Sequence, residues 1–313
     1  MAKSNEKVQR SWQLLKCSFQ IIAQNRRLLL FPVLSLGCAS VIAGIFILPA
    51  AFIPTGQPWT DPQHWQAILN RADEFLKTWD GNSNSTTFKA AAYGYCAIFY
   101  LVMMVTTTFW NVAFYHEILK ALAGDEVSVG EGLKFAIGRI RAILLWSLFA
   151  GLVGLVIRAL SRRFGVVGRM VLSFVGMAWS VAAVFVIPVM IREESANPVT
   201  LLKNSAATLK KTWGESLIGF VGIGFVNLGA SAVVFASIML LLAAGIIGLW
   251  LDYFALMVAA FTCFFVALII LSYVVTAASN VYRCALYVYA TEGVVPGPYT
   301  ADLMDAAWKV GKS

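Results

Sequence analysis

The chain has 313 residues, of which 59% are hydrophobic and only 13% are charged, and its mean hydropathy is +0.76. A soluble domain holds about 45–50% apolar and about 25% charged residues, so this composition excludes an ordinary water-soluble domain. The net charge is +8, but the basic residues lie beside apolar runs, which favours anionic lipid over nucleic acid as their partner. The sequence therefore predicts an integral membrane protein with no nucleic-acid partner.

Six apolar runs are long enough to cross a bilayer, since a spanning helix needs roughly 20 mostly apolar residues. They cover residues 28–53, 89–114, 142–160, 166–191, 216–243 and 254–278. The first run is longer than the roughly 7–15 apolar residues of a signal peptide core, so we interpret it as a span. We expect residues 1–313 to form a single all-α membrane domain, a polytopic transmembrane bundle of about six spans.

The distribution of Lys and Arg predicts the orientation, because cytoplasmic connections carry an excess of both residues. If the six spans alternate, seventeen of the 24 Lys and Arg residues fall on the side of the termini and seven fall on the other side. Both termini are therefore expected in the cytoplasm.

One connection does not follow this rule. Residues 158–169, between the third and fourth spans, contain four arginines and no acidic residue, yet the topology places them outside. Three interpretations stay open: arginines that reach outer lipid phosphates, a site for an anionic ligand or partner, or a wrong topology. The candidate lipid or partner contacts here are Arg158, Arg162, Arg163 and Arg169.

Short amphipathic helices are expected at the membrane interface, at residues 7–27, 61–80, 128–140, 198–213 and 300–310. In the fourth, helical spacing puts Leu202 and Leu209 on one side and lysines on the other. Such a helix lies flat, with its apolar face in the head-group boundary and its lysines toward the cytoplasmic surface. The candidate contacts with anionic lipid or a partner protein are Lys203, Lys210, Lys211 and Trp213.

Similar short sequences suggest that these helices belong to an internal repeat. LLKCS at 14–18, GLKFA at 132–136 and LLKNS at 201–205 each lie shortly ahead of a span. We interpret them as three degenerate units, each an interfacial helix followed by a helical hairpin. The second unit opens with Ser128 and Glu131, which have the spacing of a capping box.

Motifs of catalysis are missing from the sequence. No HExxH, GxSxG or CxxC occurs. His116 and Glu117 are neighbours at the end of the second span, but adjacent helical residues point about 100° apart, so these side chains should not converge. We expect a solvated helix end there, and we expect no enzyme activity, no metal and no cofactor.

Three asparagines are candidate polar sites inside the membrane. Asn227 falls near the middle of the fifth span, while Asn111 and Asn280 fall near the inner ends of the second and sixth spans. No charged residue lies as deep as Asn227, which disfavours an ion-coupled pump. Asn227 is expected to bond to a neighbouring helix rather than to bind substrate, and threonines 106–108 to bond to their own backbone.

The stretch FVIPVMIREESANPVTLLKNSAATLKKTWGES at 185–216 joins a proline-containing span end, acidic residues and a basic helix. Together with SWQLLKCSF at 11–19, FWNVAFY at 109–115 and ALYVYATEGVVPGPYTADLMDAAW at 285–308, it resembles a group of uncharacterised bacterial inner-membrane proteins with the pattern P..E..P..AL..S..TWGE. The likeness covers nearly the whole chain. It implies a six-helix protein of the bacterial inner membrane and carries no substrate or catalytic residue with it.

We therefore expect a non-enzymatic membrane organiser or partner-binding protein. Its partners would be the bilayer, anionic lipids and a peripheral or membrane protein, and a homo-oligomer is left open. The alternative is an uncoupled channel or transporter for a small solute or lipid, with a path past Asn227 and the threonines of the second span. A membrane enzyme is a third interpretation, but its reacting groups cannot be found in the sequence.

Overall fold

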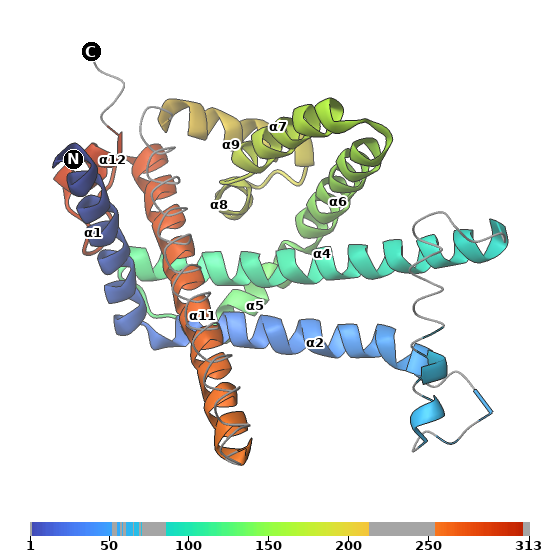
Figure 1. Ribbon diagram of the computed structural model, residues 1–313. Helices are drawn as coiled ribbons and strands as arrows, with labels where there is room; N and C mark the ends of the chain where they lie inside the picture. Colours follow the sequence, from blue (N-terminus) through green and yellow to red (C-terminus); the bar gives the residue numbers. More distant parts are fainter. Residues whose placement is uncertain are drawn as a thin grey trace.

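The computed structural model describes residues 2–51, 55–56, 58, 61–64, 66–68, 70, 86–212 and 254–308 (Figure 1). This described part of the chain is helical and contains no strand. Its elements are α1 (Ala2–Gln24), η1 (Arg26–Leu29), α2 (Leu30–Ala51), α4 (Thr86–Ala123), α5 (Val129–Gly138), α6 (Ile140–Arg163), α7 (Val166–Ala182), α8 (Val186–Arg192), α9 (Pro198–Thr212), α11 (Phe254–Glu292) and α12 (Ala301–Trp308).

Helices long and apolar enough to cross a membrane make up most of the described chain. They are Arg26–Leu48, Gly94–Ala123, Ile140–Ser161, Gly168–Arg192 and Phe264–Glu292. The most buried of their apolar windows is only 28% buried inside the protein, which suits helices whose outer surfaces face lipid. These five helices correspond to five of the six predicted spans, and the remaining one, residues 216–243, lies outside the described residues.

Buried side chains gather at one end of these helices rather than along their whole length. The core takes in the start of α2, the last turns of α4, the start of α6, most of α8 and the second half of α11. Among its members are Leu28, Phe31, Val112, Ile118, Ile143, Val189, Met190, Val281 and Leu286. In the order of the chain, these are the span ends that the Lys and Arg distribution assigns to a single side of the membrane. We call this region the packed end.

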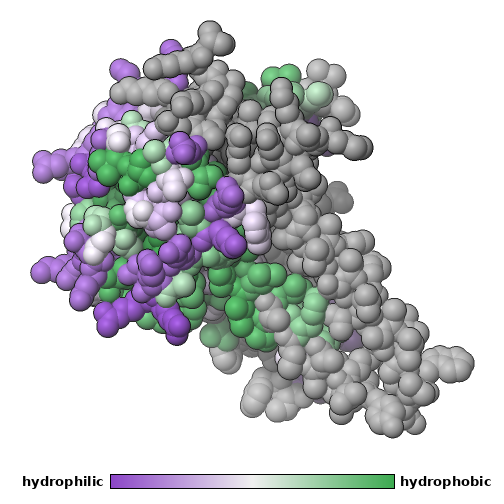
Figure 2. Space-filling model, turned by 90° about the vertical axis from the view of Figure 1, so that its left-hand side faces the viewer, coloured by the Kyte–Doolittle hydropathy of each residue, from purple (hydrophilic) through white to green (hydrophobic). Residues whose placement is uncertain are grey.

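The short helices lie on the packed end, but their apolar faces do not all face outward as expected. Leu201 and Leu209 of α9 are buried in the protein core, as are Leu15 and Ile22 of α1. The main apolar faces of these helices therefore pack against the protein rather than against the head-group boundary. Figure 2 shows the side of the molecule on which α1 and α12 lie, where the coloured surface mixes hydrophilic and hydrophobic patches. Of the helix expected at 61–80, residues 62–64, 66–68 and 70 are helical, and 71–80 lie outside the described residues.

The fourth predicted span is interrupted, which the apolar run from 166 to 191 did not indicate. Helix α7 ends in a turn at 183–185, and α8 follows. Pro188 explains the break in part, because it has no N–H to donate to the carbonyl four residues earlier. Ser205 of α9 satisfies the opened turn: its hydroxyl donates to the carbonyl of Ala182 at 2.6 Å and accepts the N–H of Phe185 at 3.1 Å. A polar side chain from α9 thus fixes the corner between α7 and α8.

The units of the expected repeat correspond to α1, α2 and α4 in the first case and to α5, α6 and α7 in the second. The first helix of a unit is not always the shorter one, because α1 has 23 residues, α2 has 22 and α7 has 17. In the third unit α9 precedes α11, with residues 213–253 between them outside the description. Helix α11 crosses α2 and α4, which run side by side (Figure 1).

Gly132 permits a close contact between α5 and α4 at the packed end. A Cβ atom at this position would lie 2.9 Å from Cγ of Glu117, 3.0 Å from the carbonyl oxygen of Ala113 and 3.0 Å from Cζ of Phe31. At least one of these neighbours is backbone, which cannot move aside without shifting α4. Gly138, on the same helix, has no atom within 4 Å of such a Cβ.

We expect Gly132→Ala to destabilise the protein by about 1–3 kcal/mol, the usual cost of forcing an extra methyl group into a packed contact. Gly138→Ala is the matched control, and its effect should be neutral or stabilising by up to about 1 kcal/mol through helix propensity. Thermal unfolding of both variants in the same detergent checks this. Equal shifts for the two variants would show that α5 does not pack on α4 in this way.

Candidate functional site

Basic side chains surround the packed end on several elements. The exposed ones among the described side chains form what we call the basic surface: Lys16, Arg26, Arg27, Lys134, Arg141, Arg192, Lys203 and Lys210. Arg192 is paired, with its Nη2 atom 2.9 Å from Oε1 of Glu292. Lys203 and Lys210 make no ion pair with any described residue, so their charges are available to a lipid or a partner.

The predicted contact residues on α9 are placed as the helical pattern suggested, as far as the structure describes them. Lys203 and Lys210 are exposed, on the side of α9 away from buried Leu201 and Leu209. The side chain of Lys211 and the whole of Trp213 lie outside the described residues.

The four arginines of the α6–α7 connection are not brought into the packed end. Arg158, Arg163 and Arg169 are exposed, and the side chain of Arg162 lies outside the description. Arg158 follows the core residue Ile143 by about 22 Å along α6, at 1.5 Å per residue. These arginines therefore form a separate basic group at the other end of α6.

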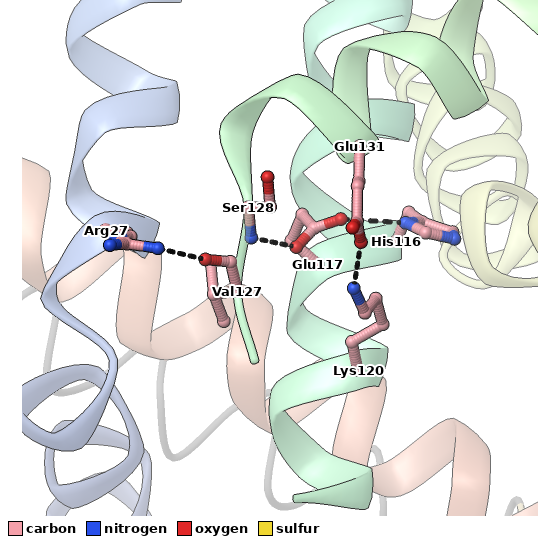
Figure 3. A network of polar contacts seen from close by, with 7 residues as sticks. All are labelled: Arg27, His116, Glu117, Lys120, Val127, Ser128 and Glu131. Atoms are coloured by element: carbon pink, nitrogen blue, oxygen red, sulfur yellow. Dashed lines mark hydrogen bonds and ion pairs between the residues drawn. The ribbon is translucent and has the colours of Figure 1, made fainter. Parts of the chain in front are cut away.

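Glu117 is the buried centre of a polar network that links α4 to α5 (Figure 3). Its Oε2 accepts the backbone N–H of Ser128 at 2.7 Å, and its Oε1 lies 3.1 Å from Nδ1 of His116. The expectation that His116 and Glu117 do not converge, and that they form a solvated helix end, is wrong. The reason is α5: the His116 ring stacks on Phe135 of α5 with 3.9 Å between ring centroids, and both side chains turn toward the surface that α5 provides.

The capping box expected from Ser128 and Glu131 does not form as predicted. The Ser128 side chain makes no capping hydrogen bond. In a capping box the acid three residues later accepts the N–H of the capping residue, but here Glu117 takes that N–H, while Glu131 pairs with Lys120. An acid from a neighbouring span thus replaces the local acid at the start of α5.

Two further contacts of this network lie nearer the surface. Nη1 of Arg27 donates to the carbonyl of Val127 at 3.2 Å, which ties the start of α2 to the loop before α5. The ammonium of Lys120 holds the pKa of the Glu131 carboxyl below its ordinary value, mainly through their hydrogen bond. Because Glu131 is exposed, water screens this pair and it adds little to stability.

Polar contacts between distant segments complete the packed end. Nδ2 of Asn204 donates to Oε2 of Glu193 at 2.7 Å, which joins α9 to the end of α8. The hydroxyls of Ser18 and Tyr299 lie 2.7 Å apart, joining α1 to the segment before α12. Burial raises the pKa of both Tyr299 and Cys17, so both stay neutral at physiological pH.

Asn111 and Asn280, two of the three predicted intramembrane polar residues, line one cavity between α2, α4 and α11. Asn227 lies outside the described residues. Thr106 and Thr108 donate to the carbonyls four residues earlier in α4, as expected. Within the described residues, no group of three or more His, Cys, Asp or Glu side chains is placed to hold a metal ion.

We expect Glu117→Ala to destabilise the protein by about 1–3 kcal/mol, because it leaves the partly buried N–H of Ser128 without its acceptor. Glu131→Ala, which removes an exposed acid from the same network, should change stability little. Thermal unfolding in one detergent compares the two variants. If Glu131→Ala proves as costly as Glu117→Ala, the buried carboxylate is not what holds α5 to α4.

Comparison with known proteins places the chain within a family. A family model, described as a family of unknown function and called DUF6159, matches residues 90–297. No curated protein and no solved structure matches the chain. The similarity to an uncharacterised family that the sequence indicated is thereby confirmed. Because the match covers more than half of the chain, the protein belongs to this family of unknown function, DUF6159.

Proposed function

We propose that this protein is a non-enzymatic organiser of the bacterial inner membrane, whose packed end lies at the cytoplasmic surface and binds anionic lipid and partner proteins. The observation that carries the proposal is the gathering of the span ends into one core covered by basic helices. A surface with exposed lysines at the membrane boundary attracts anionic lipid by about 1 kcal/mol per basic residue.

Helix α9 is the best-placed element for such contacts. Leu201, Ser205 and Leu209 fix one side of it to the protein, so Lys203 and Lys210 are held on a rigid helix rather than on a loop. A rigid basic helix loses little conformational entropy on binding, which favours a lasting contact with a lipid surface or an acidic partner.

The chemistry of the packed end supports a binding role over catalysis. Both oxygens of the Glu117 carboxylate already have partners within the protein, Ser128 and His116. Because Glu117 is also fully buried, it has no surface to offer a substrate. Its contacts instead suit a structural role, which is to hold α5 on α4.

The transport alternative gains no support from the described residues. The transport path predicted from the sequence passes the threonines of the second span and Asn227. The hydroxyls of Thr106 and Thr108 are used by their own helix, and Asn227 is not described. We therefore propose the organiser alone.

Charge reversal on α9 tests the proposal. The variant Lys203→Glu/Lys210→Glu should retain less anionic lipid when the protein is extracted from native membranes into polymer discs, with a loss of about fivefold or more. Lys203→Arg/Lys210→Arg keeps the charges and is the matched control. Mass spectrometry measures the lipids that stay bound. Cross-linking identifies the partner proteins that are lost when the charges are reversed. Unchanged lipid and unchanged partners in the reversed variant would reject this function.

A further inference from the structure

The cavity between α2, α4 and α11 has a volume of about 320 Å³ and is lined by side chains of all three helices. This lies at the lower end of the range for small-molecule sites. Phe31, Trp110 and Phe114 form its aromatic wall, and the rings of Phe31 and Phe114 stack with 5.7 Å between centroids. Ser272 and Thr276 of α11 are exposed, so the cavity opens outward between the helices.

The cavity holds amide and hydroxyl groups that the described part of the protein does not use. Asn111 makes no hydrogen bond to another described residue. Oδ1 of Asn280 accepts the hydroxyl of Tyr115 at 3.0 Å, which fixes this amide in place and leaves its Nδ2 donors for a ligand. Ser35 and Ser272 likewise have side-chain hydroxyls without a partner among the described residues. Polar groups near the hydrocarbon region are costly unless they find partners, so their gathering here indicates a polar ligand.

None of the described residues that line this cavity carries a charged side chain. Arg283 is not among the lining residues, and its guanidinium interacts with the Tyr115 hydroxyl. A phosphate group placed beside Asn111 would therefore lose its hydration without gaining a cation from the lining, which is unfavourable. The donors and acceptors of two neutral amides instead match a hydroxyl, an ester or an amide.

The apolar surroundings indicate how such a ligand would lie. One helical turn farther from the packed end, the same faces of α2 and α11 are apolar. On α2, Leu36 follows the lining residue Pro32 by four residues, and on α11, Ile269 precedes the lining residue Tyr273 by four residues. Leu36 is 53% exposed and Ile269 is 54% exposed. A hydrocarbon tail would cover these two side chains, while a polar head would reach Asn111 and Asn280 at the end of the cavity nearest the packed end.

We propose that this cavity binds the head group of a neutral lipid with hydroxyl or ester groups, with its tail along Leu36 and Ile269. Asn111 and Nδ2 of Asn280 hold the head, and Tyr115 positions the Asn280 amide. The site is separate from the basic surface, and it selects uncharged lipid where the basic surface selects anionic lipid.

Photo-cross-linking tests the site with two probes in nanodiscs containing the full-length protein. One is a monoacylglycerol with a diazirine and an alkyne in its chain, and the other is phosphatidylglycerol with the same chain. The monoacylglycerol should label peptides that contain residues 31–36 and 269–280. Asn111→Leu should lower this labelling about fivefold, as expected for the loss of a hydrogen bond in an apolar site.

Position 276 offers a matched pair of variants. Thr276 and Thr262 are both exposed on α11, and each hydroxyl donates to the carbonyl four residues earlier, but only Thr276 lines the cavity. Thr276→Phe should fill the opening and abolish labelling, while Thr262→Phe should leave it unchanged. Comparison of these two variants tests whether the probe binds in this cavity even if Asn111→Leu fails to fold.

Two results would overturn the proposal. One is equal labelling of Thr276→Phe and Thr262→Phe, and the other is labelling by the phosphatidylglycerol probe as strong as by the monoacylglycerol probe. The charge-reversed variant Lys203→Glu/Lys210→Glu should retain full labelling by monoacylglycerol, so failure of this site and failure of the proposed function remain distinguishable.

Discussion

The described structure depends on the packing of the span ends into one core. Apolar side chains in the middle of a membrane gain little by leaving lipid for protein, because lipid tails are as apolar as the protein interior. Near the membrane surface, where water is present, burial of Leu15, Ile118, Leu201 and Leu286 is favourable again. This difference explains why the long helices are exposed along the halves away from the packed end while their other ends join α1, α5, α9 and α12 in a compact region.

Two breaks in the helices at this end find polar partners on neighbouring elements. Ser205 satisfies the turn between α7 and α8, and Glu117 accepts the first N–H of the segment that begins α5. Arg27 binds the carbonyl of Val127 in the loop just before it. An unsatisfied backbone group in such a place costs about 1–3 kcal/mol. The packed end is therefore specified by a few polar side chains as much as by its apolar core.

Hydropathy alone predicted the helical class and the approximate positions of five long apolar helices, because long apolar runs leave few other structures possible. The predicted ends at 114 and 278 fall short, since the candidate spans in α4 and α11 continue to Ala123 and Glu292. The finer features depended on contacts between distant residues. Helical spacing placed Leu202 and Leu209 on the apolar side of α9, whereas the buried stripe runs through Leu201, Ser205 and Leu209. The sequence signal for this stripe was a serine that lies four residues from a leucine on either side. The burial of Glu117 could not be predicted, because it results from the approach of α5, and Gly132 gave only an indirect indication. Of the site residues, Asn111 and Asn280 were predicted separately, each as a polar residue of its own span, and only the fold brings them into one cavity.

Labelling of single cysteines in intact cells tests most directly whether the packed end faces the cytoplasm. Two single cysteines are introduced in turn into a variant whose own five cysteines are replaced by alanine. Lys203→Cys lies at an exposed position of α9 at the packed end, and Arg163→Cys lies at the far end of α6. A membrane-impermeant maleimide added to cells with a permeable outer membrane should label Arg163→Cys directly. It should label Lys203→Cys only after the inner membrane is opened. Labelling of Lys203→Cys from outside in cells with an intact inner membrane would contradict the account, because the basic helices would then lie on the wrong side of the membrane.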